Sequence, residues 1–142
     1  MAHHTQLSLF DAPTFNVFKP LKEAMQSAAK KSGKSVAQIV DMMNDLAGRF
    51  GVKLTNGNSE ALSKDTMEKW LNPQDTSRFV TLQALPIFCA VAGDSSPMDV
   101  LAKPLGFRII GPEDQELLVW AKNKRVARKS NRIARQIESK WD

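Results

Sequence analysis

Most of the side chains suited to reading a nucleic acid lie in one short stretch, residues 63–73. Met67, Trp70 and Leu71 recur there at helical spacing and are expected to face a core, with Pro73 ending the helix. The opposite side offers donors and acceptors to base edges in a DNA major groove, which is about 12 Å wide and admits one helix. We therefore expect base contacts from Ser63, Lys64, Asp65, Thr66, Glu68 and Lys69. An ordinary amphipathic helix with a solvated polar face would show the same pattern.

Contacts to the phosphate backbone would hold such a helix in the groove. Polar residues near the ends of predicted helices and in the loop over residues 53–62 are the candidates: Ser35, Gln38, Lys53, Asn72 and Arg78. That loop puts ten residues where a standard helix-turn-helix passes directly from Gly-Val to the serine that caps its second helix. Either the loop reaches a phosphate through Lys53 or Asn56, or the helix pair is not a standard DNA reader.

The C-terminal segment is a second candidate site because it concentrates the positive charge. The chain has 20 Lys+Arg, 15 Asp+Glu and a net charge of +5. Between Leu117 and Ile137 there is no acid but seven bases: Lys122, Lys124, Arg125, Arg128, Lys129, Arg132 and Arg135. Such a helix can lie along phosphates and release counterions, or it can be solvated and touch nothing. Ile133, Ile137 and Trp141 share a stripe, but Ser130 interrupts it, so the spacing does not predict a coiled coil.

A third motif, Gln6-Leu7-Ser8-Leu9-Phe10, lies in the N-terminal segment, residues 1–17, which we expect to be a flexible tail. The motif resembles the short peptide with which many bacterial replication proteins dock on the sliding clamp. That resemblance implies that Leu9 and Phe10 fill an apolar pocket while Gln6 forms hydrogen bonds nearby. The same five residues could also occur by chance, or they could form a β-strand that docks on the folded part of this chain.

Catalysis is not expected from this composition. His3 and His4 are the only histidines, in the predicted tail, and Cys89 is the only cysteine, expected to fill the core. A histidine-based triad, a metal centre in the core and an internal disulfide are therefore excluded, and no glycine-rich phosphate or dinucleotide motif is present. We predict no enzyme, cofactor or metal. No apolar run approaches the roughly 20 residues of a membrane helix and no secretory signal is visible, so we expect no membrane partner and a location in the bacterial cytoplasm.

The elements that must position these residues are predicted to be helical. Five short helices are bounded by proline, glycine and capping side chains: Pro20 to Gly33, the Ser35–Gln38 capping box to Gly51, Ser63 to Pro73, Thr81 to Gly93, and Ser96, with Pro97 first, to Gly106. Residues 107–110 are β-prone and suit pairing with another subunit, and one long helix follows from Glu113. We thus expect a tail over 1–17, a domain over 18–106, and a short extended segment with a basic helix over 107–142.

Four stretches carry a resemblance to a known fold. They are Trp70-Leu71-Asn72-Pro73, Thr81-Leu82-Gln83-Ala84-Leu85, Ala92-Gly93-Asp94 and Leu101-Ala102-Lys103-Pro104-Leu105-Gly106. With them, residues 20–106 resemble the five-helix, lambda-repressor-like helix-turn-helix fold and, more narrowly, the CII family of phage regulatory proteins. The resemblance implies a DNA-binding regulator of phage genes that acts as an oligomer.

These observations together predict an all-α protein that binds double-stranded DNA and regulates transcription from a phage or prophage. A homodimer or higher homo-oligomer is expected, because one helix covers too few base pairs to be selective. The alternative is a protein-interaction factor that reaches the sliding clamp through residues 6–10, or an acidic partner through the basic helix. An RNA-binding role is weaker, because few aromatic residues lie among the bases.

Overall fold

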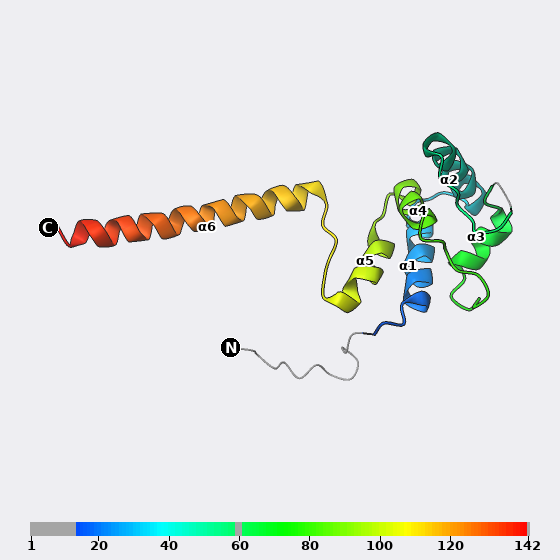
Figure 1. Cartoon of the computed structure of the whole chain (residues 1–142), viewed down its shortest axis with the longest axis horizontal. Coiled ribbons are helices and arrows are strands. Elements are labelled where there is room, and N and C mark those ends of the chain that lie inside the picture. Colours follow the sequence, from blue (N-terminus) through cyan, green and yellow to red (C-terminus); the bar gives the residue numbers. More distant parts are fainter. Residues whose placement is uncertain (1–13, 59–60, 142) are drawn as a thin grey trace. The chain divides into compact units, whose positions relative to one another are not determined.

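The computed structural model describes residues 14–58 and 61–141, and within these ranges all regular structure is helical (Figure 1). The helices are α1 (Phe18–Lys31), α2 (Val36–Phe50), α3 (Lys64–Leu71), α4 (Ala84–Ala92), α5 (Ser96–Ala102), the 3₁₀ turn η1 (Lys103–Leu105) and α6 (Pro112–Ser139). The prediction of an all-α chain is confirmed for the described residues. The chain divides into two compact units, Met1–Ile109 and Ile110–Asp142, which we describe separately.

Local capping signals set the starts of α2 and α3 as predicted. The Ser35 hydroxyl accepts a hydrogen bond from the Gln38 N–H (3.2 Å), and the Gln38 side chain accepts one from the Ser35 N–H (2.8 Å). The Ser63 hydroxyl accepts from the Thr66 N–H at 3.1 Å. Gly51 ends α2 with φ of 64°, a left-handed conformation that costs glycine little. These short-range pairs fix the direction in which α3 leaves the loop before it.

Three predicted helix starts of the first unit, those of α1, α4 and α5, were wrong by one or two residues. α1 begins at Phe18, so Pro20 is its third residue; the missing N–H costs nothing there, because the first-turn N–H groups have no intrahelical partner. α5 begins at Ser96 rather than after it, which makes Pro97 the second residue. The Ser96 N–H is instead bonded to the Asp94 carboxylate at 2.9 Å.

The β-prone segment over residues 107–110 contains no strand within the described chain. The Ile109 N–H, which a strand partner would have used, donates to the Asp99 carboxylate at 2.7 Å. A side chain ten residues earlier therefore satisfies the backbone locally. The pairing of this segment with another subunit stays a prediction.

One apolar cluster holds the first unit together. Met25, Ile39, Met43, Met67 and Phe88 are all 0% exposed, and α1 packs on α5 while α2 packs on α3 and α4. The predicted inward face of α3 is confirmed, because its apolar residues are all buried: Met67, Trp70 and Leu71. Cys89 is partly buried against the cluster, as expected of a core filler, and burial raises the pKa of its thiol.

The second unit consists mainly of α6. The predicted single long helix is confirmed, although it begins at Pro112 rather than Glu113. Pro112 takes a favoured first position, and Glu113 and Asp114 lie in the first turn, where acids complement the helix dipole. None of the side chains along its described length is buried. Across the part of the chain that the structure describes, no helix combines the length and apolarity required to span a membrane.

Candidate nucleic-acid interface

The six predicted base-contact residues lie on the polar side of α3 and at its cap. Ser63, Lys64, Asp65 and Glu68 are exposed, while Thr66 and Lys69 are half-buried. The serine caps the helix through its hydroxyl, which also donates to the Thr66 hydroxyl at 3.0 Å. Burial of the opposite, apolar side fixes the rotation of α3, so the polar side faces solvent as a group.

Two ion pairs cross this polar side. The Lys64 ammonium lies 3.8 Å from the Glu68 carboxylate, and the Lys69 ammonium lies 3.1 Å from the Asp65 carboxylate. Exposed i,i+4 pairs of this kind stabilise a helix by only about 0.3–0.5 kcal/mol, so a ligand can replace either partner at low cost. With two bases and two acids, the face carries donors and acceptors but no net charge.

The loop that precedes α3 is pinned at both ends. Leu54 and Leu62 are each 3% exposed and belong to the core. The Thr81 hydroxyl donates to the Leu54 carbonyl at 2.6 Å and accepts from the Ala84 N–H at 3.3 Å, although α4 begins at Ala84, with Gln83 at its N-cap, and not directly after Thr81 as predicted. Asn44 holds the other end, accepting from the Leu62 N–H (2.9 Å) and donating to the Leu62 carbonyl (3.0 Å). α2 and α3 therefore remain packed together despite the residues between them.

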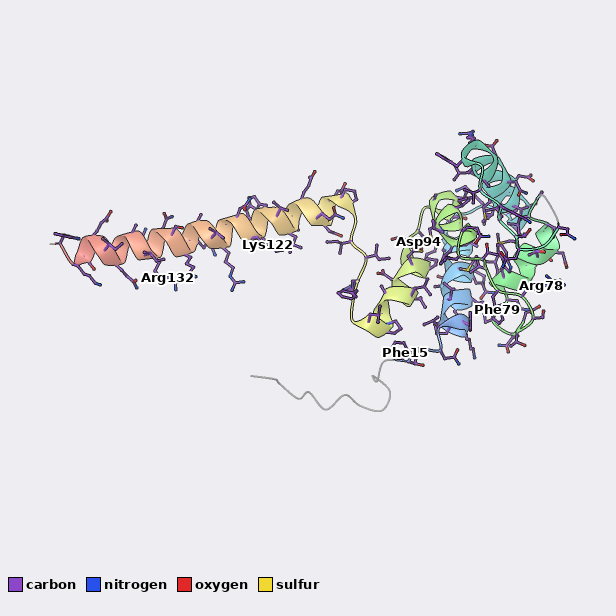
Figure 2. The ribbon with its side chains drawn as sticks, in the orientation of Figure 1. Phe15, Arg78, Phe79, Asp94, Lys122 and Arg132 are labelled. Carbon is purple, nitrogen blue, oxygen red and sulfur yellow. The ribbon has the colours of Figure 1, made fainter. Side chains whose placement is uncertain are left out.

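A cleft of about 330 Å³ opens between this loop, the start of α3 and residues 78–81. It brings together two predicted base contacts, Ser63 and Thr66, with the predicted phosphate contact Arg78. Asn56 lines it from the loop, and its side-chain oxygen accepts from Gln83 at 3.4 Å. Of the described residues in the lining, Arg78 alone is charged. Figure 2 labels Arg78 and Phe79, which follow each other after α3. The cleft thus offers one guanidinium beside hydroxyl and amide groups, a combination that suits a phosphate.

Asn72, another predicted phosphate contact, lines a second hollow of about 260 Å³. Lys30 and Lys34, from the end of α1 and the turn that follows, share this hollow, and neither was predicted to take part. Ser35 and Gln38 are exposed at the start of α2, directly after Lys34. The remaining candidate, Lys53, is exposed at the start of the loop. Of the predicted phosphate contacts, Asn72 alone lines this hollow, together with the two lysines and Glu68.

Lys22 is the residue that sequence reasoning missed most clearly. Although charged, it is only 3% exposed, and its ammonium donates to the carbonyls of Lys69 (2.8 Å) and Arg78 (2.6 Å). The ammonium also lies 4.8 Å from the centre of the Phe79 ring. Burial lowers the pKa of Lys22, an effect that the nearby Asp75 carboxylate opposes. Lys22 thereby ties the last turn of α3 and the segment that carries Arg78 to α1.

The seven bases of the C-terminal segment lie on α6 and are all exposed; Figure 2 labels Lys122 and Arg132. At about 100° of rotation per residue, all seven fall within an arc of about 160° of the helix. Lys124 also lies over the Trp120 ring, 4.8 Å from its centre. The helix therefore presents one continuous basic face, as a phosphate backbone would require.

The clamp-like peptide, with Gln6, Leu7, Leu9 and Phe10, lies outside the described residues. Comparison of the chain with protein-family models, with curated proteins and with solved structures finds no significant match. The resemblance to the lambda-repressor-like fold and to the CII family stays a prediction. The structure establishes the coarser facts: a helical unit with an exposed polar face on α3, and a basic helix in a unit of its own.

Proposed function

We propose that the chain is a sequence-specific DNA-binding regulator of transcription, of phage or prophage origin, that acts as a homo-oligomer in the bacterial cytoplasm. The observation that carries this proposal is the exposed polar side of α3 beside a cleft that contains Arg78. Donors and acceptors for bases and a cation for a phosphate then lie on the same part of the first unit. That unit has five α-helices, the number expected of the lambda-repressor-like fold that the sequence resembles.

In this mechanism α3 enters the major groove and its first turns meet the base edges. The Lys69 ammonium leaves the Asp65 carboxylate and donates to the acceptors of a guanine. The Asp65 carboxylate can then accept a hydrogen bond from the amino group of a cytosine. Arg78 holds one phosphate beside the groove, and Lys30, Lys34 and Asn72 hold another. The basic face of α6 adds affinity that does not depend on sequence.

The test is binding of the purified protein to genomic fragments, with selection and sequencing at two salt concentrations. A recurrent, palindromic site that survives the higher salt is the expected result. Binding that is uniform across fragments and lost at the higher salt would mean that only the basic helix acts, and the proposal would fail.

The selected site then permits a sharper test of α3. Lys69→Ala should weaken binding to that site by about 1–3 kcal/mol while leaving random DNA unaffected. Lys19→Ala, an exposed lysine on α1, is the matched control and should change neither affinity. If Lys69→Ala and the wild type bound the selected site equally well, and random DNA equally well, the assignment of α3 as the base-contacting helix would be wrong.

A further inference from the structure

α6 carries a stripe of apolar side chains beside its basic face. At about 100° per residue, Val119, Val126, Ile133 and Ile137 fall within about 40° of one another. They are 57%, 63%, 46% and 53% exposed, respectively. Within the segment from Leu117 to Ile137, Lys122 and Lys129 flank this stripe on one side, about 20° and 40° from Ile133, and no base flanks it on the other side. The helix thus has two faces, one for anions and one without a partner in the described structure.

The spacing on the apolar side is that of a heptad repeat. Val119, Val126 and Ile133 occupy one inward position, called d, at intervals of seven residues. The other inward position, a, holds Asn123, Ser130 and Ile137. Ser130 interrupts the stripe formed by Ile133, Ile137 and Trp141. In the heptad register, by contrast, Ser130 occupies an a position and is a small polar residue of the seam. Position e, beside the seam, holds Trp120, Ala127, Ala134 and Trp141.

We propose that this seam, made by the a and d residues of α6, is the surface on which the α6 helix of a second copy of the chain packs, parallel and in register, as a two-stranded coiled coil. The inference deepens the proposed function by naming where the copies of the oligomer meet, and it rests on that function only for the use of the outward basic faces.

Charge selects a second copy, and the parallel orientation, as the occupant. Two helices that each carry seven bases can approach closely only where the bases of one do not face those of the other. In a parallel pair the g residues Lys122 and Lys129 lie across from the e residues Ala127 and Ala134 of the other copy, so no two like charges meet. An antiparallel pair would place g beside g and bring lysines together.

Asn123 supports the same arrangement. A single asparagine at an a position specifies register and two-stranded pairing, because each copy's amide satisfies the other across the seam. The stems of Lys122 and Lys129 can cover the neighbouring alanines while their ammonium groups stay in water. The seam spans about three heptads, near the minimum for a stable pair, so we expect association that depends on concentration.

The first experiment measures the mass of the full chain by sedimentation equilibrium over a range of concentrations. The wild type should approach twice its monomer mass of 15.8 kDa. Val126→Asn and Ile133→Asn should each weaken association by at least about tenfold. Leu118→Asn is the matched control, because Leu118 is 48% exposed, close to the 46% of Ile133, but lies outside the seam. A monomer at every concentration, or seam variants that associate like the control, would overturn the proposal.

A second experiment tests register and does not depend on those variants. In a Cys89→Ala background, Asn123→Cys should form a disulfide-linked dimer on mild oxidation, because residue 123 meets its own copy only in a parallel pair. Asn131→Cys, on the basic side, is the control and should stay monomeric. Equal cross-linking at both positions would overturn the parallel seam. A dimer without any preferred DNA sequence would keep the seam and refute the regulator, whereas a monomer that binds a specific site would do the reverse.

Discussion

Replacing Lys22 by methionine tests how the segment after α3 is held on the first unit. The Lys22 ammonium donates to the Lys69 carbonyl at 2.8 Å and to the Arg78 carbonyl at 2.6 Å. Within α3, the Lys69 carbonyl would accept from the N–H of residue 73, which is a proline and has none. Lys22 therefore satisfies a carbonyl for which α3 itself has no donor.

The expected loss of stability in Lys22→Met follows from these two hydrogen bonds. A hydrogen bond to a charged group contributes about 1.5–3 kcal/mol, and its removal leaves a carbonyl without its donor. Methionine fills the space of the lysine stem and removes the cost of burying an ammonium, so part of the loss is recovered. We expect Lys22→Met to lower the free energy of unfolding by about 2–4 kcal/mol.

Urea unfolding followed by circular dichroism measures this change, with Lys19→Met as the control on the exposed side of α1. A change of less than about 0.5 kcal/mol in Lys22→Met, similar to an ordinary surface substitution, would refute the reasoning. The variant should also bind the selected DNA site more weakly, because Arg78 loses its anchor. In that case the effects of Lys22→Met and Arg78→Ala on binding should be less than additive.

Three further predictions concern the first unit. Asn44→Ala should lower the free energy of unfolding in urea by about 1–3 kcal/mol, because it leaves both backbone groups of Leu62 without partners. Hydrogen bonds from Ser96 hold the pKa of Asp94 below its usual 3.8, so its carboxylate contributes stability above that pH and loses it as the pH falls through the lower folded value. Asp94→Asn should therefore make unfolding less sensitive to acid below about pH 4 in pH-jump denaturation, and an unchanged acid profile would contradict this. Because burial raises the pKa of Cys89, its thiol should react with a disulfide reagent at pH 8 far more slowly in the folded chain than in urea.

Features that depend on near neighbours in the chain were predictable. The Ser35–Gln38 capping box, the Ser63 cap and the buried side of α3 follow from spacings of three or four residues, and all three are confirmed. The wrong starts of α1 and α5 have the same origin. Pro20 and Ser96 suit the first turn of a helix at more than one position, so the residues themselves do not fix the boundary.

Features that depend on distant partners were not predictable. Lys22 is bonded to carbonyls 47 and 56 residues further along the chain. Asn44 is bonded to a backbone segment 18 residues away. In the sequence both are ordinary polar residues on a helix, and only the packing of α1 and α2 brings them to their partners. For the same reason Arg78 could be named as a phosphate contact, but the cleft that it lines with Ser63 and Thr66 could not.

The distribution of charge between the two units bears on how affinity and selectivity would arise. The polar side of α3 has equal numbers of bases and acids, paired with one another, so it attracts DNA weakly at a distance. α6 has seven bases on one face, and each phosphate that these neutralise steepens the dependence of binding on salt by about 0.9 units. The basic helix would therefore hold the protein on any DNA, and α3 would distinguish sequences once held. If two α6 helices pair through the proposed seam, most of each basic face would stay available, and each pair would carry two copies of α3. Under the proposed function, two copies of α3 would supply the selectivity that one short, electrically neutral helix lacks.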